Sequence, residues 1–467
     1  MDRNENIESV RARTEPWDVV VIGGGATGVG CALDAATRGL EVLLVEQQDF
    51  GSGTSSRSTK LVHGGVRYLR QGTIPLVREA LRERAYLLKN APHVVHVQKF
   101  IVPCYSSFQK LFYGIGLKVY DMLAGKLSIG RSRYLSRKET IERLPTIKSD
   151  GLVGGILYMD GQFDDTRLVI DMAMTASRHG ACLVNYMRVG NLTKETDGNI
   201  LVSLYNTISG EILDTSARTV INATGAFCDP IRKMSDEAAK PVVTFARGSH
   251  IVLPRKFLPS NHALMIPKTS DGRVLFCIPW HEHVLVGTTD VPCENTENGM
   301  HPSDEEIEFL LETAGTFLNK QPTREDVLSR FAGVRPLISR SNTTNTAKLS
   351  RSHKLYIDDN CLITITGGKW TTYRQMAEEA VDAAINVGHL SATECVTKTL
   401  PIDAPPSSTG ERIHPDLPYT KGDIDRAYTL EMAQTIDDVL SRRTRISFLN
   451  ESIAEQTKKK LTADGRK

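Results

Sequence analysis

A glycine-rich turn near the start of the chain constrains the fold more than any other sequence feature. Residues 18–22 form an apolar, β-branched run, which is typical of a buried parallel strand. Gly23, Gly25 and Gly28 follow directly with G-x-G-x-x-G spacing, and a helical stretch and a second apolar run then end at Glu46. In a βαβ unit, these glycines permit the tight turn, the approach of a pyrophosphate and close helix packing, respectively. The sequence therefore predicts a Rossmann-like α/β sheet.

This unit predicts that a dinucleotide is bound. The helix N-terminus offers unpaired N–H groups and a partial positive charge to the phosphates. The carboxylate of Glu46 can accept hydrogen bonds from the ribose hydroxyl groups. Because that carboxylate would repel a phosphorylated ribose, we do not expect NADP. A glycine turn with a purely structural role is the alternative interpretation.

Three further segments favour FAD over NAD. Residues 49–68 form a loop rich in Ser, Thr and Gly, whose hydroxyls and amides can contact a second phosphate and a ribityl chain. Residues 220–225 and 366–373 are later apolar runs that lead into glycine turns. We therefore expect non-covalently bound FAD. The residues expected to bind it are Gly23, Gly25, Gly28, Glu46, Thr54, Ser55, Ser56, Ala223, Gly225, Gly368 and Lys369.

The three glycine turns lie far apart in the sequence, which predicts one sheet assembled from separate segments with a second domain inserted between them. Residues 242–252 and 273–286 alternate or cluster β-branched and aromatic residues, as antiparallel strands do. We expect an oxidoreductase domain over residues 16–383. Its FAD-binding segments are expected at about residues 16–80, 150–235 and 350–383, and its substrate domain at about residues 81–149 and 236–349.

The C-terminal part of the chain has a different composition. Residues 384–412 include a Pro/Ser-rich linker, and residues 413–467 predict a short helical domain. Within that domain, residues 421–449 are charged and helical, whereas residues 456–467 indicate a frayed basic tail.

Composition and charge exclude several classes of protein. The 57 basic and 55 acidic residues leave a net charge of +2, which argues against a nucleic-acid-binding role for the whole chain. Hydrophobic residues make up 40% of the chain, so bulk disorder is not expected. No uninterrupted apolar run approaches the ~18 residues of a spanning helix. The eight cysteines form no C-x-x-C pair, and His281 and His283 are more typical of a turn than of ligands, so we expect no metal site.

A set of spaced motifs resembles the FAD-dependent glycerol-3-phosphate dehydrogenases, which are D-amino-acid-oxidase-like flavoproteins. The resemblance runs from about residue 18 to residue 379 and resumes at His414. It implies an FAD domain, a substrate domain with an antiparallel sheet and a helical C-terminal domain. It also implies an enzyme that oxidises sn-glycerol 3-phosphate to dihydroxyacetone phosphate and passes electrons from FAD to a quinone. The motifs that carry it are residues 54–69, 248–252, 278–280 with 287–290, 333–336 and 367–373.

Two alternatives to this function stay open. An oxidase of the same superfamily would deliver the electrons to oxygen and release hydrogen peroxide. A non-catalytic flavin-binding protein is the other alternative, because the chain is shorter between residues 402 and 414 than is usual in the family and its C-terminal domain is therefore expected to be abbreviated.

Oxidation of a phosphorylated alcohol needs cations for the phosphate and a group that takes the hydroxyl proton. Arg67, Arg335 and Lys369 lie beside glycine-rich turns, which favours a shared anion site over three surface charges. His63 and His250 are alternative bases, because an imidazole titrates near neutral pH. Polarisation of the alkoxide by Arg335, with water as the base, is a third option. The resemblance implies that the substrate-binding residues are Arg67, Tyr68, His250, Arg335 and Lys369.

Residues 105–138 predict peripheral contact with a membrane, where a quinone would be met. Seven basic residues and one acid, Asp121, are interleaved there with many apolar residues, as in an interfacial amphipathic helix. An ordinary helix with its apolar side on the core is the alternative. The start of the chain does not resemble a transit peptide, so we expect a cytoplasmic protein on the inner face of the cytoplasmic membrane, with the mitochondrial inner membrane as the alternative. A homodimer is also considered.

Overall fold

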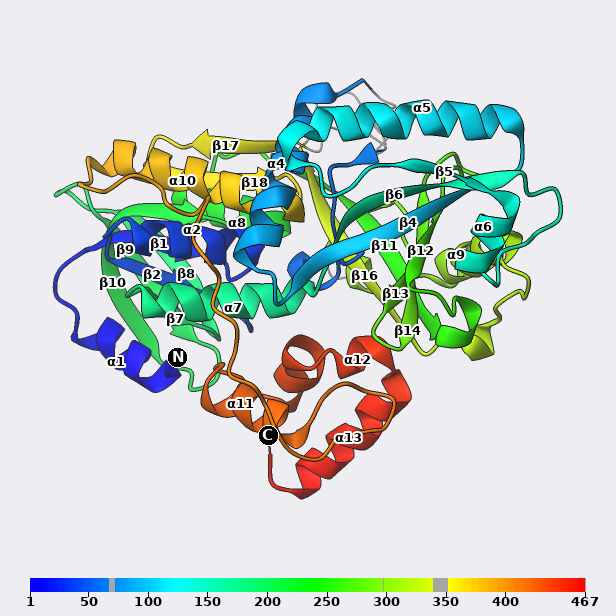
Figure 1. Ribbon diagram of the computed structural model, residues 1–467. Helices are drawn as coiled ribbons and strands as arrows, with labels where there is room; N and C mark the ends of the chain where they lie inside the picture. Colours follow the sequence, from blue (N-terminus) through cyan, green and yellow to red (C-terminus); the bar gives the residue numbers. More distant parts are fainter. Residues whose placement is uncertain (67–71, 297, 339–351, 467) are drawn as a thin grey trace.

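The computed structural model describes residues 1–66, 72–296, 298–338 and 352–466. The chain forms two β-sheets, and its C-terminal helices lie at the bottom of the view in Figure 1. In the first sheet, β1 (Trp17–Ile22) pairs in parallel with β2 (Val42–Val45) on one side and with β10 (Ile212–Asn222) on the other. β18 (Leu362–Gly367) pairs in parallel with β10. The prediction of one α/β sheet assembled from distant segments is therefore confirmed.

The first sheet has the strand order β17–β18–β10–β1–β2–β7. β7 (Cys182–Val184) forms one edge and β17 (His353–Ile357) forms the other, where it runs antiparallel to β18. β8 (Met187–Lys194) and β9 (Ile200–Asn206) form a hairpin that pairs with β10. This topology places the ends of β1, β10 and β18 side by side.

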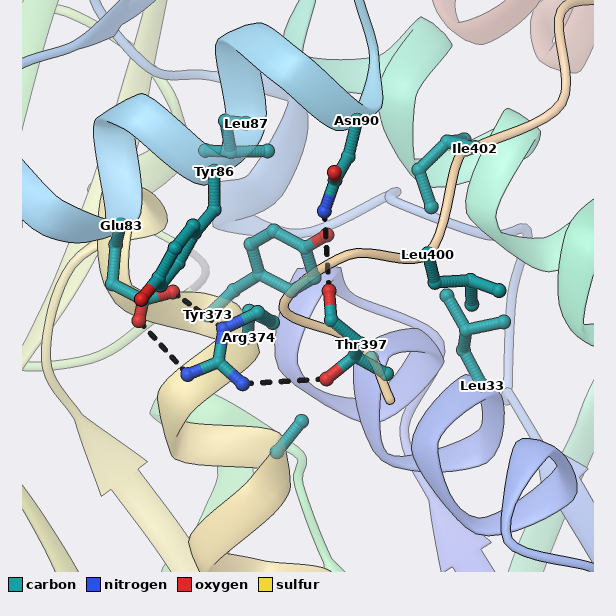
Figure 2. Close-up of a pocket in the computed structure, with 12 residues that line it drawn as sticks. Leu33, Glu83, Tyr86, Leu87, Asn90, Tyr373, Arg374, Thr397, Leu400 and Ile402 are labelled. Carbon is teal, nitrogen blue, oxygen red and sulfur yellow. Dashed lines mark hydrogen bonds and ion pairs between the residues drawn. The ribbon is translucent and has the colours of Figure 1, made fainter. Parts of the chain in front are cut away.

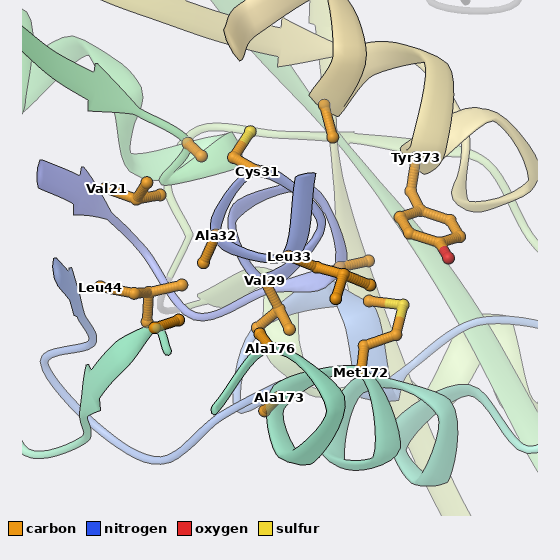
Figure 3. Packing of buried hydrophobic residues seen from close by; sticks show 14 of the residues in the cluster. Val21, Val29, Cys31, Ala32, Leu33, Leu44, Met172, Ala173, Ala176 and Tyr373 are labelled. Atoms are coloured by element: carbon orange, nitrogen blue, oxygen red, sulfur yellow. The ribbon is translucent and has the colours of Figure 1, made fainter. Parts of the chain in front are cut away.

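Alternate residues of the central strand face two separate cores, as the pleat of a strand requires. Val19 and Val21 belong to a core covered by three helices, whereas Val20 and Ile22 belong to a core covered by α1 (Arg3–Ala12) and the β8–β9 hairpin. Figure 3 shows the three-helix side, with Val29 on one helix close to Ala176 on another. Burial on both faces explains why almost every residue of β1 is apolar. The three helices are α2 (Ala26–Thr37), α7 (Asp165–Arg178) and α10 (Tyr373–Gly388).

The second sheet is mainly antiparallel and has the order β15–β11–β14–β13–β12–β4–β6–β3, with β16 added to β11 and β5 added to β6. Both segments that were predicted to form antiparallel strands lie in it. Its strands are β3 (Leu61–Val62), β4 (Val95–Cys104), β5 (Arg133–Ser136), β6 (Gly154–Phe163), β11 (Val243–Pro254), β12 (His262–Ile266), β13 (Leu275–Trp280), β14 (His283–Gly287), β15 (Val291–Cys293) and β16 (Ser329–Ile338).

Two of the predicted FAD-binding segments contain a strand of the second sheet. The first is residues 16–80, because β3 pairs with β6. We expected residues 150–235 to belong to the FAD-binding segments, but β6 pairs with β4 along its whole length, from Gly154 opposite Cys104 to Phe163 opposite Val95. Residues 154–163 therefore belong to the second sheet. The reason is that an apolar run predicts a buried strand without indicating which of two sheets it joins.

The remaining helices lie around the two sheets. α5 (Ser107–Ala124) is capped at its start by Ser106, whose Oγ accepts a hydrogen bond from the Gln109 N–H at 3.2 Å, and at its end by Gly125, which has a φ of +51°. It runs along the top of the second sheet in Figure 1. None of the described helices combines the length and apolar character that a membrane crossing needs. The others beside the sheets are α4 (Ile74–Asn90), α6 (Arg137–Arg143), α8 (Cys228–Ser235) and α9 (Asp304–Phe317).

The C-terminal segment is helical, as predicted, but its end is not a frayed tail. α11 (Lys421–Thr429) and α12 (Ile446–Leu449) precede α13 (Glu451–Ala463), which includes most of the residues expected to be frayed. Ile453, Ala454, Thr457 and Leu461 of α13 are buried. Their helical spacing gives one packed face, which the basic composition of residues 456–467 concealed.

The segment after α10 is held against the oxidoreductase part. Figure 2 shows Arg374 between Glu83 of α4 and Thr397 of this segment. Arg374 donates to both carboxylate oxygens of Glu83 at 2.8 Å and to Thr397 Oγ1 at 3.3 Å. The Asn90 side chain donates to the Thr397 carbonyl oxygen at 3.2 Å. The predicted linker, residues 384–412, therefore starts inside α10 and continues as a segment packed on α4.

Candidate active site

The ends of β1, β10 and β18 open into a cavity of about 820 Å³. In an open α/β sheet, ligands bind at the carboxyl ends of the parallel strands, because the turns and helix N-termini that follow them point at the same space. Residues of β11 and β16 in the second sheet line the same cavity. The cavity is therefore built by both sheets.

The first glycine turn borders this cavity and has no room for side chains. Gly23 has a φ of +109°, and a Cβ there would lie 2.8 Å from the carbonyl oxygen of Ala223. A Cβ at Gly28 would overlap the carbonyl oxygen of Gly23. Gly23 and Gly25 line the cavity, whereas Gly28 is buried in α2 beneath them. The backbone before α2 therefore borders the cavity without intervening side chains, and its contact with a pyrophosphate stays a prediction.

Ser55 and Glu46 lie on either side of this turn. Ser55 Oγ accepts a hydrogen bond from the Ala26 N–H at 2.9 Å. Glu46 accepts from the Gly24 N–H at 2.7 Å with one carboxylate oxygen and from the Gln48 N–H at 2.9 Å with the other. Burial raises the pKa of the Glu46 carboxyl, and these two hydrogen bonds oppose that change. Each oxygen keeps a second acceptor site, so Glu46 can still accept ribose hydroxyl groups.

The other predicted cofactor residues differ in their position. Thr54, Ala223, Gly225, Gly368 and Lys369 line the cavity. Ser56 does not line it. Instead, its carbonyl oxygen accepts hydrogen bonds from two buried cations, Lys60 and Arg445, both at 2.7 Å. Backbone cradles that exclude side chains, a helix N-terminus and a carboxylate thus border one cavity, and this donor and acceptor set fits FAD.

His250 lies on β11 and lines the cavity with almost no exposure to solvent. Its Nε2 is 2.9 Å from Thr59 Oγ1, and its ring stacks on Phe331 with centroids 4.9 Å apart. Burial and the nearby cations Lys60 and Arg335 lower the pKa of His250 well below its usual value. Burial and these cations therefore favour the neutral imidazole, which can accept a proton but is a weaker base than an ordinary histidine.

His63 lines the cavity in the loop after β3, where its backbone N–H donates to Thr371 Oγ1 at 3.2 Å. Arg335 lines it from β16, and its guanidinium donates to Thr288 Oγ1 and to the Thr289 carbonyl oxygen, both at 3.1 Å. Both side chains that we proposed to act on the hydroxyl group, together with Arg335, thus border one cavity.

The guanidinium of Arg335 depends on a glycine opposite it. A Cβ at Gly248 would overlap this guanidinium, so the glycine leaves the space that Arg335 occupies. Asp290 pairs with Arg335 at 3.2 Å. Of the three predicted phosphate ligands, Arg335 and Lys369 line the same cavity. Arg67 and the neighbouring Tyr68 lie outside the described residues.

A buried ionic network lies close to His250, and the sequence did not predict it. Lys60 donates to Asp165 at 2.6 Å, and Arg445 lies 3.4 Å from the other oxygen of Asp165. Arg445 belongs to the C-terminal segment, where Phe448 contacts Phe331 edge to face with centroids 4.8 Å apart. In the sequence, Lys60 lies within residues 49–68, which indicated only a loop rich in Ser, Thr and Gly. No local pattern predicts that its partner is more than one hundred residues away.

Comparisons with known proteins agree with this architecture. Residues 18–374 match the FAD dependent oxidoreductase family, and residues 364–463 match the C-terminal domain of alpha-glycerophosphate oxidase. The mitochondrial glycerol-3-phosphate dehydrogenase of Arabidopsis thaliana is 46% identical, over 83% of this chain and 64% of its own length. The corresponding protein of Mus musculus is 40% identical, over 95% of this chain and 69% of its own length. The chain thus spans about two thirds of the length of these curated relatives.

Solved structures show the same fold. The glycerol-3-phosphate dehydrogenase from Bacillus halodurans, solved with FAD, has a TM-score of 0.76 at 27% sequence identity and covers 98% of this chain and 91% of its own. The L-alpha-glycerophosphate oxidase from Mycoplasma pneumoniae has a TM-score of 0.66 at 18% identity, over 84% of this chain and 100% of its own, which is a likeness of fold alone.

The fold and the cavity define a D-amino-acid-oxidase-like flavoprotein. The chain belongs to the FAD dependent oxidoreductase family, and its relatives include glycerol-3-phosphate dehydrogenases. The predicted fold class and the predicted cofactor, FAD, are confirmed.

Proposed function

We propose that this protein oxidises sn-glycerol 3-phosphate to dihydroxyacetone phosphate with FAD as the hydride acceptor. One observation carries the proposal, which is that Arg335, Lys369, His63 and His250 line the same cavity as the glycine cradle. A substrate with a phosphate at one end and a secondary alcohol at the other needs this combination of cations and a proton acceptor. The printed names of the plant and mouse relatives support the same substrate.

The chain's own residues account for binding and proton removal. Arg335 and Lys369 would hold the phosphate, and Arg335 is fixed in place by Thr288 and Thr289 before the substrate arrives. FAD, when bound, supplies the acceptor for the hydride. His250, kept neutral by burial, or His63 would take the hydroxyl proton. Water acting beside Arg335 remains the third option for this proton.

The decisive experiment is anaerobic reduction of the purified holoenzyme. We expect glycerol 3-phosphate to bleach the yellow flavin spectrum and glycerol to leave it unchanged, because only the first carries the phosphate. A spectrum unchanged by glycerol 3-phosphate would mean a non-catalytic flavin-binding protein. The rate of flavin reduction in His63→Ala and His250→Ala variants, measured by stopped flow, identifies the base. If both variants reduce the flavin at near-normal rates, neither histidine is the base, and water beside Arg335 takes the proton.

We further propose that the electrons pass to a membrane quinone. α5 supports this proposal because apolar residues occupy two of its faces. Gly114, Leu117 and Tyr120 are buried toward the protein, whereas Phe108 is 75% exposed and Phe112 is 52% exposed. The alternative, an ordinary helix with its apolar side on the core, explains the inner face only. The large exposed apolar side chains of α5 are Phe108, Leu111, Phe112, Ile115 and Met122.

The charge around this outer face suits a surface of anionic lipid. Lys118 on α5 and Lys126 just after it are exposed as well, and such a combination of cations and apolar side chains binds bilayers peripherally and reversibly. The relatives from Arabidopsis thaliana and Mus musculus are named as mitochondrial, which favours the mitochondrial inner membrane over the cytoplasmic membrane as the location of this chain. The homodimer remains a prediction that sedimentation velocity tests.

The acceptor itself is tested by turnover. With a water-soluble quinone analogue under anaerobic conditions, we expect sustained oxidation of glycerol 3-phosphate. In air without quinone, we expect little hydrogen peroxide. Peroxide formed at the rate of substrate oxidation, with no stimulation by quinone, would identify an oxidase instead.

A further inference from the structure

The carboxylate of Asp160 on β6 connects three elements that are distant in the sequence. One oxygen accepts a hydrogen bond from Arg84 of α4 at 2.9 Å and from the Gly64 backbone N–H at 3.4 Å. The other oxygen accepts from the Tyr120 hydroxyl of α5 at 2.8 Å. Asp160 therefore joins α4 and α5 to the loop that carries His63.

These groups are buried, so each contact matters for the position of the loop. Asp160, Arg84 and Tyr120 are 3%, 1% and 2% exposed, respectively. A buried carboxylate is held by all of its donors, because losing one leaves an acceptor without a partner in a medium of low dielectric. Asp160 also lines the cavity, next to His63 and Gly65. The network is thus in contact with the space where the reaction would occur.

Packing supports the same connection. A Cβ at Gly64 would overlap both the Tyr120 hydroxyl and the Leu81 side chain, so the loop backbone lies directly against α5 and α4. Val77, Leu81, Tyr120 and Ala124 form a small separate core between these two helices. On its other side, the loop is held by Thr371, which accepts from the His63 N–H.

We propose that Tyr120 and Asp160 are positioning residues that fix the loop at residues 63–65 against the inner face of α5. This inference rests on the proposed function, because the loop places His63 in the cavity. It assigns α5 a second role besides its exposed apolar face. Tyr120 and Asp160 act through the loop backbone and need not touch the substrate. A side chain displaced by about 1 Å can lower a rate about a hundredfold, so the position of the loop limits catalysis.

The test uses the holoenzyme of Tyr120→Phe, which removes one hydroxyl and keeps the packed ring. We expect wild-type FAD content, a kcat/KM for glycerol 3-phosphate that falls about five- to tenfold, and faster amide exchange confined to residues 61–66. Asp160→Asn should give the same two effects, and the double variant should add little to either, because both changes break one connection. Tyr134→Phe is the control, since its hydroxyl also lies against α5, at Gly114, but is not among the donors to Asp160.

The outcomes separate this inference from the proposed function. Exchange at residues 61–66 that is the same in Tyr120→Phe and wild type would overturn the inference, whether or not the enzyme turns over. Faster exchange throughout the molecule would indicate general destabilisation and would overturn it as well. If the wild-type flavin is not reduced by glycerol 3-phosphate, the proposed function fails, while the exchange measurement still decides the role of Tyr120. If Asp160→Asn does not fold, Tyr120→Phe alone decides.

Discussion

Lys60 and Asp165 form an ion pair in which neither side chain is exposed, with Lys60 Nζ 2.6 Å from Asp165 Oδ2. Burial and the nearby Arg445 lower the pKa of Lys60 to about 7, although Asp165 opposes both effects. The rings of Trp280, Phe331 and Phe448 lie 5.0 to 5.5 Å from Nζ. The pair is close to His250, because the hydroxyl of Thr59 lies 2.9 Å from His250 Nε2 and Thr59 directly precedes Lys60 in the chain.

Lys60→Met is expected to destabilise the protein strongly, because it leaves the carboxylate of Asp165 buried without this partner. Breaking one side of a buried pair costs about 3–5 kcal/mol in the free energy of unfolding. Urea denaturation checks this value. Lys256→Met is the matched control, because Lys256 is 57% exposed and pairs with Asp326 at 2.9 Å. An exposed pair contributes at most about 1 kcal/mol. Equal effects of the two substitutions would contradict the prediction.

Stability should fall as the pH falls below about 6.5, the pKa of an ordinary histidine. His250 has a lowered pKa in the folded chain because of burial, so below that pH the unfolded state binds a proton that the folded state does not. Each such group contributes a slope of up to about 1.4 kcal/mol per pH unit. His281 and His283 also have lowered pKa values because of burial and add to the slope.

His250→Gln should remove the share of this slope that belongs to His250. Urea midpoints measured between pH 5 and pH 7.5 for the wild type and the variant give the two slopes. If both slopes are the same, His250 is not kept neutral in the folded state.

Gly28→Ala is expected to abolish FAD binding. The added Cβ would overlap the carbonyl oxygen of Gly23 and push the turn or α2 out of place. The ratio of flavin absorbance to protein absorbance after purification measures the loss. Gly116→Ala on α5 is the control, because a Cβ there meets nothing within 4 Å. It should retain FAD and gain up to about 1 kcal/mol in helix stability. A Gly28→Ala protein that is purified with a full complement of FAD would contradict the proposed cradle.

Gly248→Ala should weaken substrate use while FAD remains bound. The Cβ would displace the guanidinium of Arg335 without changing any charge. Because a charge-assisted hydrogen bond contributes about 1.5–3 kcal/mol, kcat/KM for glycerol 3-phosphate should fall about 10- to 100-fold. Gly190→Ala is the control, since a Cβ there would lie 3.7 Å from the Ser203 carbonyl oxygen, an ordinary contact. Unchanged steady-state kinetics in Gly248→Ala would exclude Arg335 as a phosphate ligand.

Replacing Phe108 and Phe112 by Ser should weaken binding to anionic vesicles about 100-fold or more. Each buried phenyl ring contributes about 1.5–3 kcal/mol to such binding. Cosedimentation with vesicles at low salt measures the partition, and added salt should weaken it because the flanking lysines are screened. Ile208→Ser with Ile212→Ser is the control, since these side chains are also exposed but lie near and on β10. If both double variants bind equally, α5 is not the contact surface.

The sequence predicted those parts of the molecule in which neighbouring residues define the structure. The spacing of Gly23, Gly25 and Gly28 sufficed for the cradle, because the turn, the helix and the strand are all local. The later turns at Gly225 and Gly368 were recognised for the same reason. His250 and Arg335 were proposed from the chemistry of their side chains and from the glycines beside them, and the resemblance to a family then implied that they bind the substrate.

The residues that escaped prediction depend on contacts between distant segments. The strand at residues 154–163 was assigned to the wrong sheet, because its apolar pattern suits either one. The helical face of residues 453–461 was concealed by basic side chains that point to solvent.

The sequence by itself therefore determined the nucleotide-binding unit, the cofactor class and the amphipathic character of residues 105–138, because each depends on residues that are close together in the chain. Only the tertiary structure decided that Arg335, Lys369, His63 and His250 share one cavity, that Lys60 pairs with Asp165 and Arg445, and that Asp160 joins α5 to the loop at Gly64. The physical reason is that hydrogen bonds and ion pairs act over a few ångströms in space, whatever the separation along the chain.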